Sequence, residues 1–559
     1  MAGIILWLGL VLTAQAGPAD PDPVTMKQPD GSFVTVHLHG DEFCHWMTDD
    51  LGREVVVGKD GRLVFPDADI PSLAKRFSDG GALRAEAAAA GHSLVAPHDG
   101  EIHFPVILLE FQDVGFTLSR PAESFDTHFN RDVRDYFSEG SSGLFTPVFD
   151  IYGPVTLPQN LSHYGGNTLG QTDRNSKYAF LNACRLAAEH GLDFSKYDYD
   201  CDGYVDEVMF IYAGYAESHG GGPDAIWPHF ASLDSRLDHS STDNVFGSVK
   251  VDAYGCCPEL NGNYGANICG IGLICHEFCH SIGLPDLYDT DYSTNGLSEH
   301  MSRFSVMGTG NNNSSCKNPP YLCAIERYLL GWSDLPEPVS DDIVVLDGIQ
   351  TGKACRINTD NPGEFFILEC RNLKGRDADI GAGGLLIYHV DMSSNNVGTV
   401  TAEYMWDNWH DINEINAYAS HPCCSPVASS PTSGITARVF PGSDSVTSAR
   451  LVSWSGAQVY DMVTDIAFTG DKVIFHHNGP LYKAGINAIY NPGEGSYSSG
   501  YSFGLTLVGR RDPSAVDWYL DGIPAGGASV TLESGEHVVT AVLHFAEGDE
   551  ILEQFLKVK

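Results

Sequence analysis

The chain has 559 residues, enough for about three or four domains, and 43% of them are apolar, so it can bury a sizeable core. Its 32 Lys and Arg residues against 73 Asp and Glu residues give a formal net charge of −41. A chain this acidic repels phosphate backbones, which argues against nucleic-acid binding as a main role. The acidity suits a soluble exported protein and oxygen-rich sites for cations such as calcium.

The first sixteen residues have the pattern of a secretory signal peptide. Residues 4–12 are an apolar run too short to span a bilayer, and Ala14 and Ala16 supply the small residues of a cleavage site before Gly17. We therefore expect a signal peptide over residues 1–16 and a secreted, periplasmic or extracellular protein. No later stretch reaches about 18 apolar residues, so we expect no transmembrane span. The 14 cysteines permit disulfides in that environment, but their pairing cannot be read from the sequence.

Two blocks of different character follow the signal. Residues 17–97 contain short strand patterns separated by Asp-Gly turns, and we interpret them as a small pro-segment. Residues 98–335 combine apolar strand patterns at 105–111 and 208–213 with a helical pattern over 177–190. This second block is therefore expected to be an α+β domain.

After residue 335, helical patterns largely give way to strands. Strand patterns occur at 342–346, 365–368, 385–388 and 472–475. They predict a β-sandwich over residues 336–480. A tight turn at 521–522, between further strand patterns, predicts a small Ig-like β-domain over residues 481–559. We expect these two all-β domains to bind substrate or a surface, and the chain to be a monomer.

The most informative segment is a histidine motif that follows an apolar stretch. His276 and His280 are four residues apart, so on a helix they lie one turn apart on the same face. Two imidazoles in this arrangement can bind one zinc ion. Glu277 lies beside them and is placed to take a proton from a metal-activated water. An ordinary helix with two surface histidines accounts less well for the apolar residues before the motif.

The residues after the motif extend this pattern. Gly283 can end the helix in a left-handed conformation, after which Asp286 takes the position of a third zinc ligand. Glu299 is the alternative third ligand, because some zincins use a downstream glutamate instead. Met307 lies in a Ser-Val-Met-Gly sequence that is similar to the Met-turn beneath such sites.

The segment HEFCHSIGLPDLYD, with Met307 downstream, resembles the immune inhibitor A family of secreted bacterial zinc metalloproteases. Further segments resemble the same family, namely 136–143, 224–229, 324–327, 330–332, 364–369 and 384–391. The resemblance implies a zincin-like or metzincin-like catalytic domain, a secreted proenzyme and zinc-dependent endopeptidase activity on extracellular proteins. It also implies that His276 and His280 are zinc ligands and that Glu277 is the catalytic base.

The chemistry expected of this motif is hydrolysis of a peptide bond. Zinc acidifies a water molecule, Glu277 removes its proton, and the hydroxide attacks a carbonyl group that the metal polarises. Glu277 then delivers the proton to the leaving nitrogen. Tyr288 and Tyr321 are candidates for a further oxyanion donor, although tyrosines at such positions are more often packing residues.

A second cation site is predicted in an acidic loop. Asp198, Asp200, Asp202 and Asp206 occupy positions 1, 3, 5 and 9 of a calcium-loop pattern, with glycine at position 6. Position 12 is Met209 rather than glutamate, so the loop is not a complete EF-hand. We expect calcium bound here to stabilise the fold. The alternative is a solvated acidic turn.

Two questions stay open at this point. The pro-segment contains His37, His39, Asp41, Cys44 and His45, and any of these side chains can reach the zinc and silence the enzyme. The most specific form of this hypothesis is a Cys44 thiolate bound to the zinc.

The competing interpretation of the whole chain is an inactive adhesin or surface-binding protein that retains a metal-binding helix. A third interpretation is a calcium-dependent structural surface protein, and only the acidic loop supports it.

Overall fold

The computed structural model describes residues 17–558, with gaps at 42–44, 59, 67–93, 168–171, 238–241, 292–295, 340–342, 395–400, 411, 431–433, 456–457, 478–487, 490–500, 505–506, 509–512, 528 and 547. The predicted signal peptide and Cys44 lie outside the described residues. Among the helices that are described, none is both long and apolar enough to cross a lipid bilayer. Thirteen cysteines of the described part carry free thiols.

The chain divides into two compact units. The first comprises residues 1–334, 373–381 and 390–426, and the second comprises residues 335–372, 382–389 and 427–559. This division differs from the linear boundary predicted at residue 335, because two later segments belong to the first unit. A boundary predicted from composition divides the chain at one point, so it cannot show that residues 373–381 and 390–426 fold back into the first unit.

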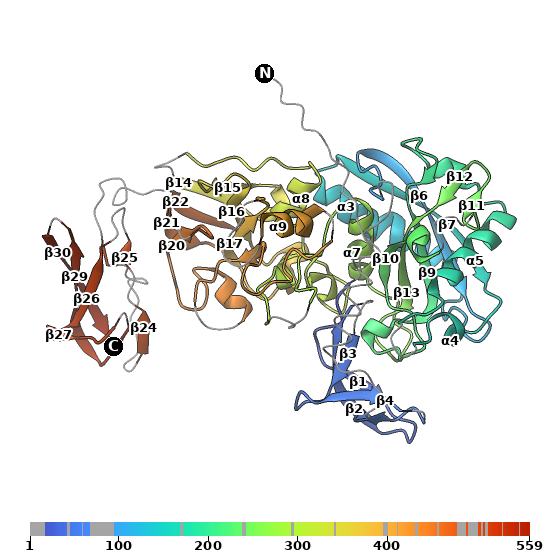
Figure 1. Cartoon of the computed structure of the whole chain (residues 1–559), viewed down its shortest axis with the longest axis horizontal. Helices are drawn as coiled ribbons and strands as arrows, with labels where there is room; N and C mark the ends of the chain where they lie inside the picture. The colour runs from blue at the N-terminus through green and yellow to red at the C-terminus, as the bar shows by residue number, and fades with distance from the viewer. Residues whose placement is uncertain are drawn as a thin grey trace. The chain divides into compact units, whose positions relative to one another are not determined.

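The first unit is built on a five-stranded sheet in the order β10-β13-β9-β6-β7 (Figure 1). The strands are β6 (Gly100–Glu110), β7 (Phe145–Thr156), β9 (Val208–Tyr215), β10 (His229–Ser232) and β13 (Ala253–Leu260). All neighbours are parallel except β10, which runs antiparallel to β13. The central strand β9 is buried on both faces, which explains why its sequence is continuously apolar rather than alternating.

Two helices of the first unit pack on opposite sides of strand β6. These are α5 (Ser176–Glu189) and α7 (Ile271–Ser281). Ile107 of β6 shares a buried core with Phe180 of α5. Phe104 of the same strand packs edge-to-face on Phe278 of α7, with ring centroids 4.9 Å apart. Because successive side chains of a strand alternate between its faces, residues 104 and 107 point to opposite sides of the sheet.

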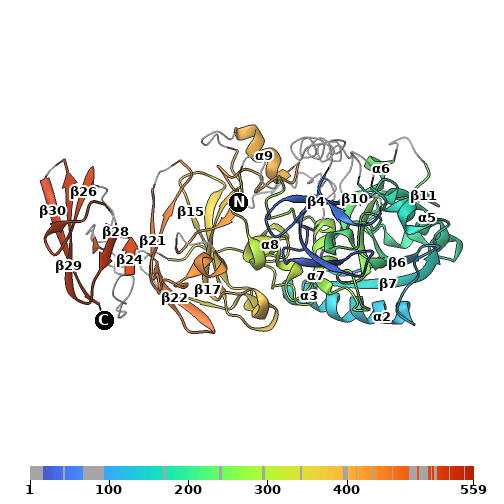
Figure 2. The ribbon, with the colours of Figure 1, turned by 90° about the horizontal axis from the view of Figure 1, so that it is seen from below.

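Shorter elements complete the first unit, and Figure 2 shows α2 beside β7. The other described helices of this unit are α2 (Pro121–Thr127), η1 (His128–Val133), α3 (Arg134–Gly140), α4 (Leu161–Tyr164), η2 (Phe194–Tyr197), η3 (Glu217–His219), α6 (Leu233–Arg236), η4 (Ser302–Phe304), η5 (Gly310–Asn312), α8 (Ala324–Leu329), η7 (Gly375–Asp379) and α9 (Ala402–His410). Further short strands are β8 (Tyr204–Val205), β11 (Val245–Phe246), β12 (Val249–Val251) and β18 (Cys424–Pro426).

The predicted pro-segment contains a five-stranded sheet whose strands follow chain order. They are β1 (Val24–Lys27), β2 (Phe33–Gly40), β3 (His45–Thr48), β4 (Glu54–Val57) and β5 (Leu63–Val64). Its small core includes Val36 and Leu38, and it also includes Trp227 from the following block. The N-terminal sheet therefore packs on the block that carries the histidine motif.

The second unit contains two sheets around one core. Strands β14 (Ile343–Asp347), β22 (Lys472–His477), β21 (Gln458–Phe468) and β20 (Ala449–Val452) form one sheet in that order. The other contains β15 (Ala354–Asn358), β16 (Glu364–Arg371), β17 (Gly384–Asp391) and β19 (Val439–Phe440). Leu346, Leu368, Ile387 and Phe475 belong to the shared core. Short 3-10 turns are η6 (Ile349–Thr351) and η8 (Ile435–Arg438).

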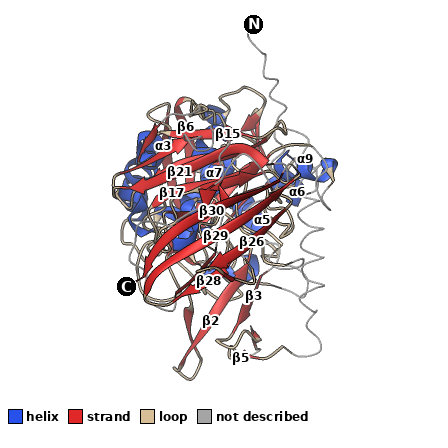
Figure 3. Ribbon diagram, turned by 90° about the vertical axis from the view of Figure 1, so that its left-hand side faces the viewer, coloured by secondary structure: helices blue, strands red, loops and turns tan. Residues whose placement is uncertain are grey.

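The last part of the chain is also made of strands. They are β23 (Ala488–Ile489), β24 (Tyr501–Gly504), β25 (Leu507–Val508), β26 (Ala515–Leu520), β27 (Ile523–Pro524), β28 (Ser529–Leu532), β29 (Gly535–Phe545) and β30 (Gly548–Val558). Figure 3 shows β26, β29 and β30 side by side, in the sheet order β27-β26-β29-β30. Asp521 and Gly522 both have positive φ, as a two-residue hairpin turn requires, which confirms the predicted turn. The Ig-like assignment stays a prediction.

Candidate functional site

Glycines at two points fix the helix that carries the histidine motif. Gly272 lies one turn before His276, and a Cβ atom there would collide with the backbone oxygen of Asn311. At the other end, Gly283 has a φ of +106°. The amides of Gly283 and Leu284 donate to the carbonyls of His280 and Cys279, at 3.0 and 2.9 Å, which is the Schellman pattern of helix termination. The predicted left-handed end of the helix is confirmed, and the chain turns back along the histidine face.

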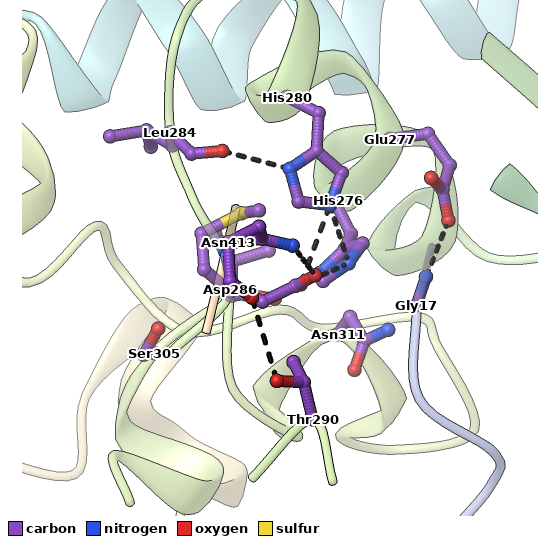
Figure 4. Close-up of polar contacts among 12 residues, drawn as sticks. Gly17, His276, Glu277, His280, Leu284, Asp286, Thr290, Ser305, Asn311 and Asn413 are labelled. Carbon is purple, nitrogen blue, oxygen red and sulfur yellow. Dashed lines mark hydrogen bonds and ion pairs between the residues drawn. The ribbon is translucent and has the colours of Figure 1, made fainter. Parts of the chain in front are cut away.

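Three side chains converge on that face (Figure 4). The Nε2 atoms of His276 and His280 are 3.2 Å apart. Oδ1 of Asp286 lies 3.3 Å from Nε2 of His276 and 3.4 Å from Nε2 of His280. All three side chains are buried. The fold therefore brings together three of the residues that the sequence predicts as metal ligands.

Backbone carbonyls hold both imidazole rings in this orientation. Nδ1 of His276 donates to the carbonyl of Val306, and Nδ1 of His280 donates to that of Leu284, each at 2.8 Å. Because a carbonyl only accepts, a neutral ring carries its proton on Nδ1 and turns the lone pair of Nε2 inwards. Within the described chain, no hydrogen-bond donor satisfies Oδ1 of Asp286. Three electron-pair donors therefore face one another, an arrangement that requires positive charge between them.

The pKa values of His276 and Asp286 also reflect this need for positive charge between the three side chains. Burial lowers the pKa of His276, but Asp286 and the charge of Glu277 outweigh burial and raise that pKa to about 9. Burial raises the pKa of Asp286, yet the two histidines hold it well below its usual range. The cluster thus attracts a proton when nothing else is bound, and a metal cation satisfies the same electrostatic need.

The geometry of the three donors fits zinc. Two ligands that are each about 2.0–2.1 Å from a tetrahedral zinc ion lie about 3.3–3.4 Å from one another. The three separations of 3.2, 3.3 and 3.4 Å agree with that value. Two imidazoles and one carboxylate are also a donor set that zinc accepts, and three protein ligands leave a fourth position open for chemistry.

Glu277 follows His276 on α7 and is fully buried. Its Oε1 accepts a hydrogen bond from the backbone nitrogen of Gly17 at 2.9 Å (Figure 4). Burial raises the pKa of Glu277 to about 8, although His276 and the Gly17 amide act to lower it. A carboxyl group with a pKa near neutrality can take up a proton and release it again at physiological pH.

Two other predicted residues lie at different places in this unit. Glu299 is exposed, whereas the carboxylate of Asp286 is buried and lies 3.3 and 3.4 Å from the two histidine Nε2 atoms. The geometry therefore favours Asp286 over Glu299 as the third ligand. Met307 is buried in the turn that supplies the Val306 carbonyl. Glu326 of α8 accepts from Ser305 Oγ at 2.6 Å and from the Met307 amide at 3.2 Å, and so braces this turn.

Asn413 is a site residue that the sequence does not reveal. Its Nδ2 donates to Oδ2 of Asp286 at 2.7 Å, and its Oδ1 accepts from the Asp286 amide at 2.7 Å. Both bonds turn the remaining oxygen of Asp286 towards the histidines. Asn413 belongs to the segment 390–426, far from the motif in sequence, and no local pattern marks it.

The groups predicted to plug the site from the N-terminal block have other partners. Nε2 of His37, His39 and His45 lies 3.2, 2.8 and 3.1 Å from side-chain oxygens of Asp50, Thr48 and Glu217 respectively. From the N-terminal block, Gly17 contacts Glu277 through its backbone nitrogen. Its carbonyl oxygen in turn accepts from Nε1 of Trp227 at 3.1 Å, so the backbone of residue 17 is held from both sides.

Asp198, Asp200 and Asp202 of the acidic loop lie between η2 and β8, and Asp206 directly follows β8. Carboxylate oxygens of Asp198, Asp200 and Asp202 lie within 4.8 Å of one another. Oδ1 of Asp198 is buried and has no hydrogen-bond partner within the described chain. Burial and the charges of these three aspartates raise the pKa of Asp206 to about 7. Four carboxyl groups therefore lie close together in and beside one loop.

Comparison with known proteins identifies relatives of the block that contains these residues. Residues 108–322 match the catalytic domain of the immune inhibitor A peptidase M6 family. Immune inhibitor A of Bacillus thuringiensis subsp. alesti is 28% identical over 200 residues, which cover 32% of this chain and 28% of that protein. The pre-pro-metalloprotease PrtV of Vibrio cholerae is 29% identical over 227 residues, which cover 36% of this chain and 23% of that protein.

The aligned regions thus span less than a third of the length of these curated relatives. A solved structure of catalytically inactive OgpA from Akkermansia muciniphila, in complex with an O-glycopeptide, is also similar, at 8% identity and a TM-score of 0.22, covering 84% of this chain and 96% of that one. That likeness is too weak to support an argument. The match over residues 108–322 includes His276, Glu277, His280 and Asp286, so the part of the chain that carries the candidate site is similar to the catalytic domain of the immune inhibitor A peptidase family.

Proposed function

We propose that the chain is a secreted, zinc-dependent endopeptidase that hydrolyses peptide bonds of extracellular proteins. The observation that carries this proposal is the triangle of His276 Nε2, His280 Nε2 and Asp286 Oδ1, with separations of 3.2–3.4 Å, next to the buried carboxyl group of Glu277. The relatives named metalloproteases support the same activity. His276, His280 and Asp286 would hold the zinc ion.

The chain's own residues supply the proton transfers. A zinc ion bound to these ligands supplies Lewis-acid chemistry, which acidifies water and polarises a peptide carbonyl. Glu277 accepts the proton of the attacking water on its carboxylate and then donates it to the leaving nitrogen. Its burial excludes bulk water, which keeps that proton available for return. Val306, Leu284 and Asn413 act by holding the three ligands in place.

The proposal is tested on the purified protein with an unfolded substrate such as casein. We expect close to one zinc per chain, and hydrolysis that is lost with a zinc chelator and restored by added zinc. A chain that binds zinc but shows no chelator-sensitive cleavage, before or after removal of its N-terminal block, would instead support the inactive surface-binding protein.

We also propose that residues 17–97 are a pro-segment that keeps the site closed. The contacts of Gly17 with Glu277 and Trp227, at 2.9 and 3.1 Å, support this assignment. Backbone placed against the general base excludes a substrate from the same space. The predicted signal cleavage after residue 16 would leave Gly17 as the first residue of the exported chain.

Removal of this block is expected to increase activity on casein at least tenfold, because it exposes Glu277. Hydrolysis is measured on one preparation before and after limited proteolysis, with the new N-terminus determined by mass spectrometry. A Gly17→Val variant provides a second measurement, since an added Cβ would lie 3.0 Å from Asn311 Nδ2 and 3.3 Å from Glu277 Oε1. It should raise the activity of the unprocessed chain. Equal activity before and after removal would refute the pro-segment.

We propose that the loop with Asp198, Asp200, Asp202 and Asp206 binds calcium. The clustered oxygens, the unpaired buried Oδ1 of Asp198 and the raised pKa of Asp206 support a cation here. Calcium prefers such carboxylate oxygens and stabilises the folded state that holds them.

Calcium is expected to raise Tm, and a calcium chelator to lower it, by several degrees. The change is measured by calorimetry in the wild type and in Asp200→Asn with Asp202→Asn. The double variant should lose the response to calcium, because it removes two charges from the loop. As a matched control, Asp49→Asn removes an aspartate from a turn of the N-terminal sheet and should keep the response. An unchanged Tm in wild type after calcium removal would rule the site out.

A further inference from the structure

Asn311, in the short η5 turn, has a buried amide that faces the catalytic carboxyl group. Its side chain is fully buried, and within the described chain its Nδ2 donates to no acceptor. A Cβ atom built on Gly17 would be 3.0 Å from this Nδ2 and 3.3 Å from Oε1 of Glu277. The amide and the carboxyl group therefore border the same small space, which the backbone of Gly17 fills (Figure 4).

Neighbouring side chains fix which end of the amide points into that space. Oδ1 of Asn311 accepts from Nδ2 of Asn312 at 3.1 Å, and Oδ1 of Asn312 lies 3.1 Å from Nε2 of His219. Burial lowers the pKa of His219, so its ring is neutral and carries one proton. An amide oxygen only accepts, which places that proton on Nε2 and leaves Nδ1 to accept from Ser218 Oγ at 2.9 Å. The whole chain of hydrogen bonds directs the Nδ2 of Asn311 towards Glu277.

The backbone of Asn311 is fixed as well. Its carbonyl oxygen packs against Gly272, where a Cβ atom would collide with it. Gly272 precedes His276 by four residues, so the same face of α7 that presents the histidines also seats Asn311. Direct contact with α7, the helix that carries the two histidines and Glu277, therefore fixes the position of the Asn311 backbone relative to these residues.

A buried hydrogen-bond donor without a partner lowers stability, and in native proteins an ordered water, a ligand or a functional role usually accounts for one. The space next to this donor is the one where backbone atoms of a peptide chain already lie, at Gly17. The group that a peptide backbone offers to a donor is its carbonyl oxygen. A neutral amide also suits a position beside Glu277, because it adds no charge that would alter the carboxyl group's affinity for a proton.

We propose that Asn311 is a catalytic residue that donates its Nδ2–H to a backbone carbonyl oxygen of the bound peptide beside Glu277. The bond orients the peptide for attack and stabilises negative charge that develops on the carbonyl oxygen. His219 and Asn312 are positioning residues, which act by holding the Asn311 amide. Tyr321, a candidate for such a donor from sequence, has its hydroxyl against Gly375 instead. The inference rests on the proposed peptidase function.

The test compares Asn311→Ala and Asn311→Asp with wild type on one quenched fluorescent peptide, with each protein measured after removal of residues 17–97. Asn311→Ala is expected to lower kcat/KM by roughly 10- to 100-fold, because it removes the donor. Asn311→Asp keeps the shape and the acceptor for Asn312 but replaces Nδ2 with oxygen, and it should lose at least as much. Zinc content and Tm should match wild type in at least one of the two variants.

The matched control is Asn313→Ala, which removes a buried amide from the same turn. Its Nδ2 donates to the Arg303 carbonyl at 3.2 Å rather than facing Glu277, so kcat/KM should change less than about threefold. An active wild type with Asn311 variants of equal kcat/KM would overturn the inference and leave the peptidase intact. Loss of zinc in both Asn311 variants would also overturn it, by assigning Asn311 a structural role. A wild type without chelator-sensitive hydrolysis would refute the proposed function itself.

The positioning role of His219 has a separate readout. His219→Phe removes the donor to Asn312 and should reduce kcat/KM several-fold with zinc retained. His219→Gln places an amide N–H in the same region and should restore most of the lost activity. A glutamine variant as impaired as the phenylalanine variant would argue that the ring is needed for packing and not to orient Asn311.

Discussion

Glu277→Gln is expected to abolish peptide hydrolysis while leaving zinc bound. Glutamine keeps the size of the side chain and an oxygen that can accept from the Gly17 amide. It cannot take a proton from water or return one to the leaving nitrogen, and loss of general acid–base catalysis costs about 10²- to 10⁴-fold in rate. The three donors to zinc are unchanged, because Glu277 lies beside the triangle that they form.

This result is measured as kcat/KM on a peptide, with zinc per chain determined by mass spectrometry on the same sample. Glu299→Gln is the matched control, since it makes the same change on an exposed glutamate of the same unit and should behave as wild type. Activity of Glu277→Gln within a few-fold of wild type would contradict the assigned role and require another base.

Asp286→Ala is expected to release zinc and, for that reason, to eliminate activity. Asp286 supplies the only formal negative charge in the triangle, and its Oδ1 contacts both histidines, at 3.3 and 3.4 Å. Two neutral imidazoles alone form an incomplete site for zinc. Bound zinc should fall from about one per chain to well below one after dialysis against buffer that contains no metal.

Glu299→Ala and Asn413→Ala complete the comparison. Glu299→Ala should keep its zinc, and loss of zinc there with retention in Asp286→Ala would reverse the assignment of the third ligand. Asn413→Ala removes the donor to Asp286 Oδ2 and should weaken zinc binding by roughly 10- to 100-fold, as expected for a residue that orients a ligand. Zinc affinity is measured by competition with a chromogenic chelator, and an unchanged affinity in Asn413→Ala would show that Asp286 does not depend on it.

The local features of the site were predictable from the sequence. The four-residue spacing of His276 and His280 becomes one shared face as soon as the segment is helical. Gly283 ends that helix because a left-handed residue is needed there, and its φ of +106° is observed. The apolar runs that became β9, β16 and β17 were also recognisable, because a strand buried on both faces leaves a continuous apolar signature.

Other features depend on contacts between residues that are distant in the chain. Asn413 reaches Asp286 only because the segment 390–426 belongs to the first unit, and the Val306 carbonyl reaches His276 only through the turn braced by Glu326. The contact of Gly17 with Glu277 is of the same kind, and so is the contact of His219 with Asn312, which sets the direction of the Asn311 amide. The sequence by itself determined the ligand types, their helical spacing and the end of the helix, since these follow from backbone geometry within a few residues. The tertiary structure alone decided what orients the candidate ligands and what contacts Glu277, because hydrogen bonds between residues 30 to 260 positions apart depend on how separate elements pack and leave no periodic trace in the chain.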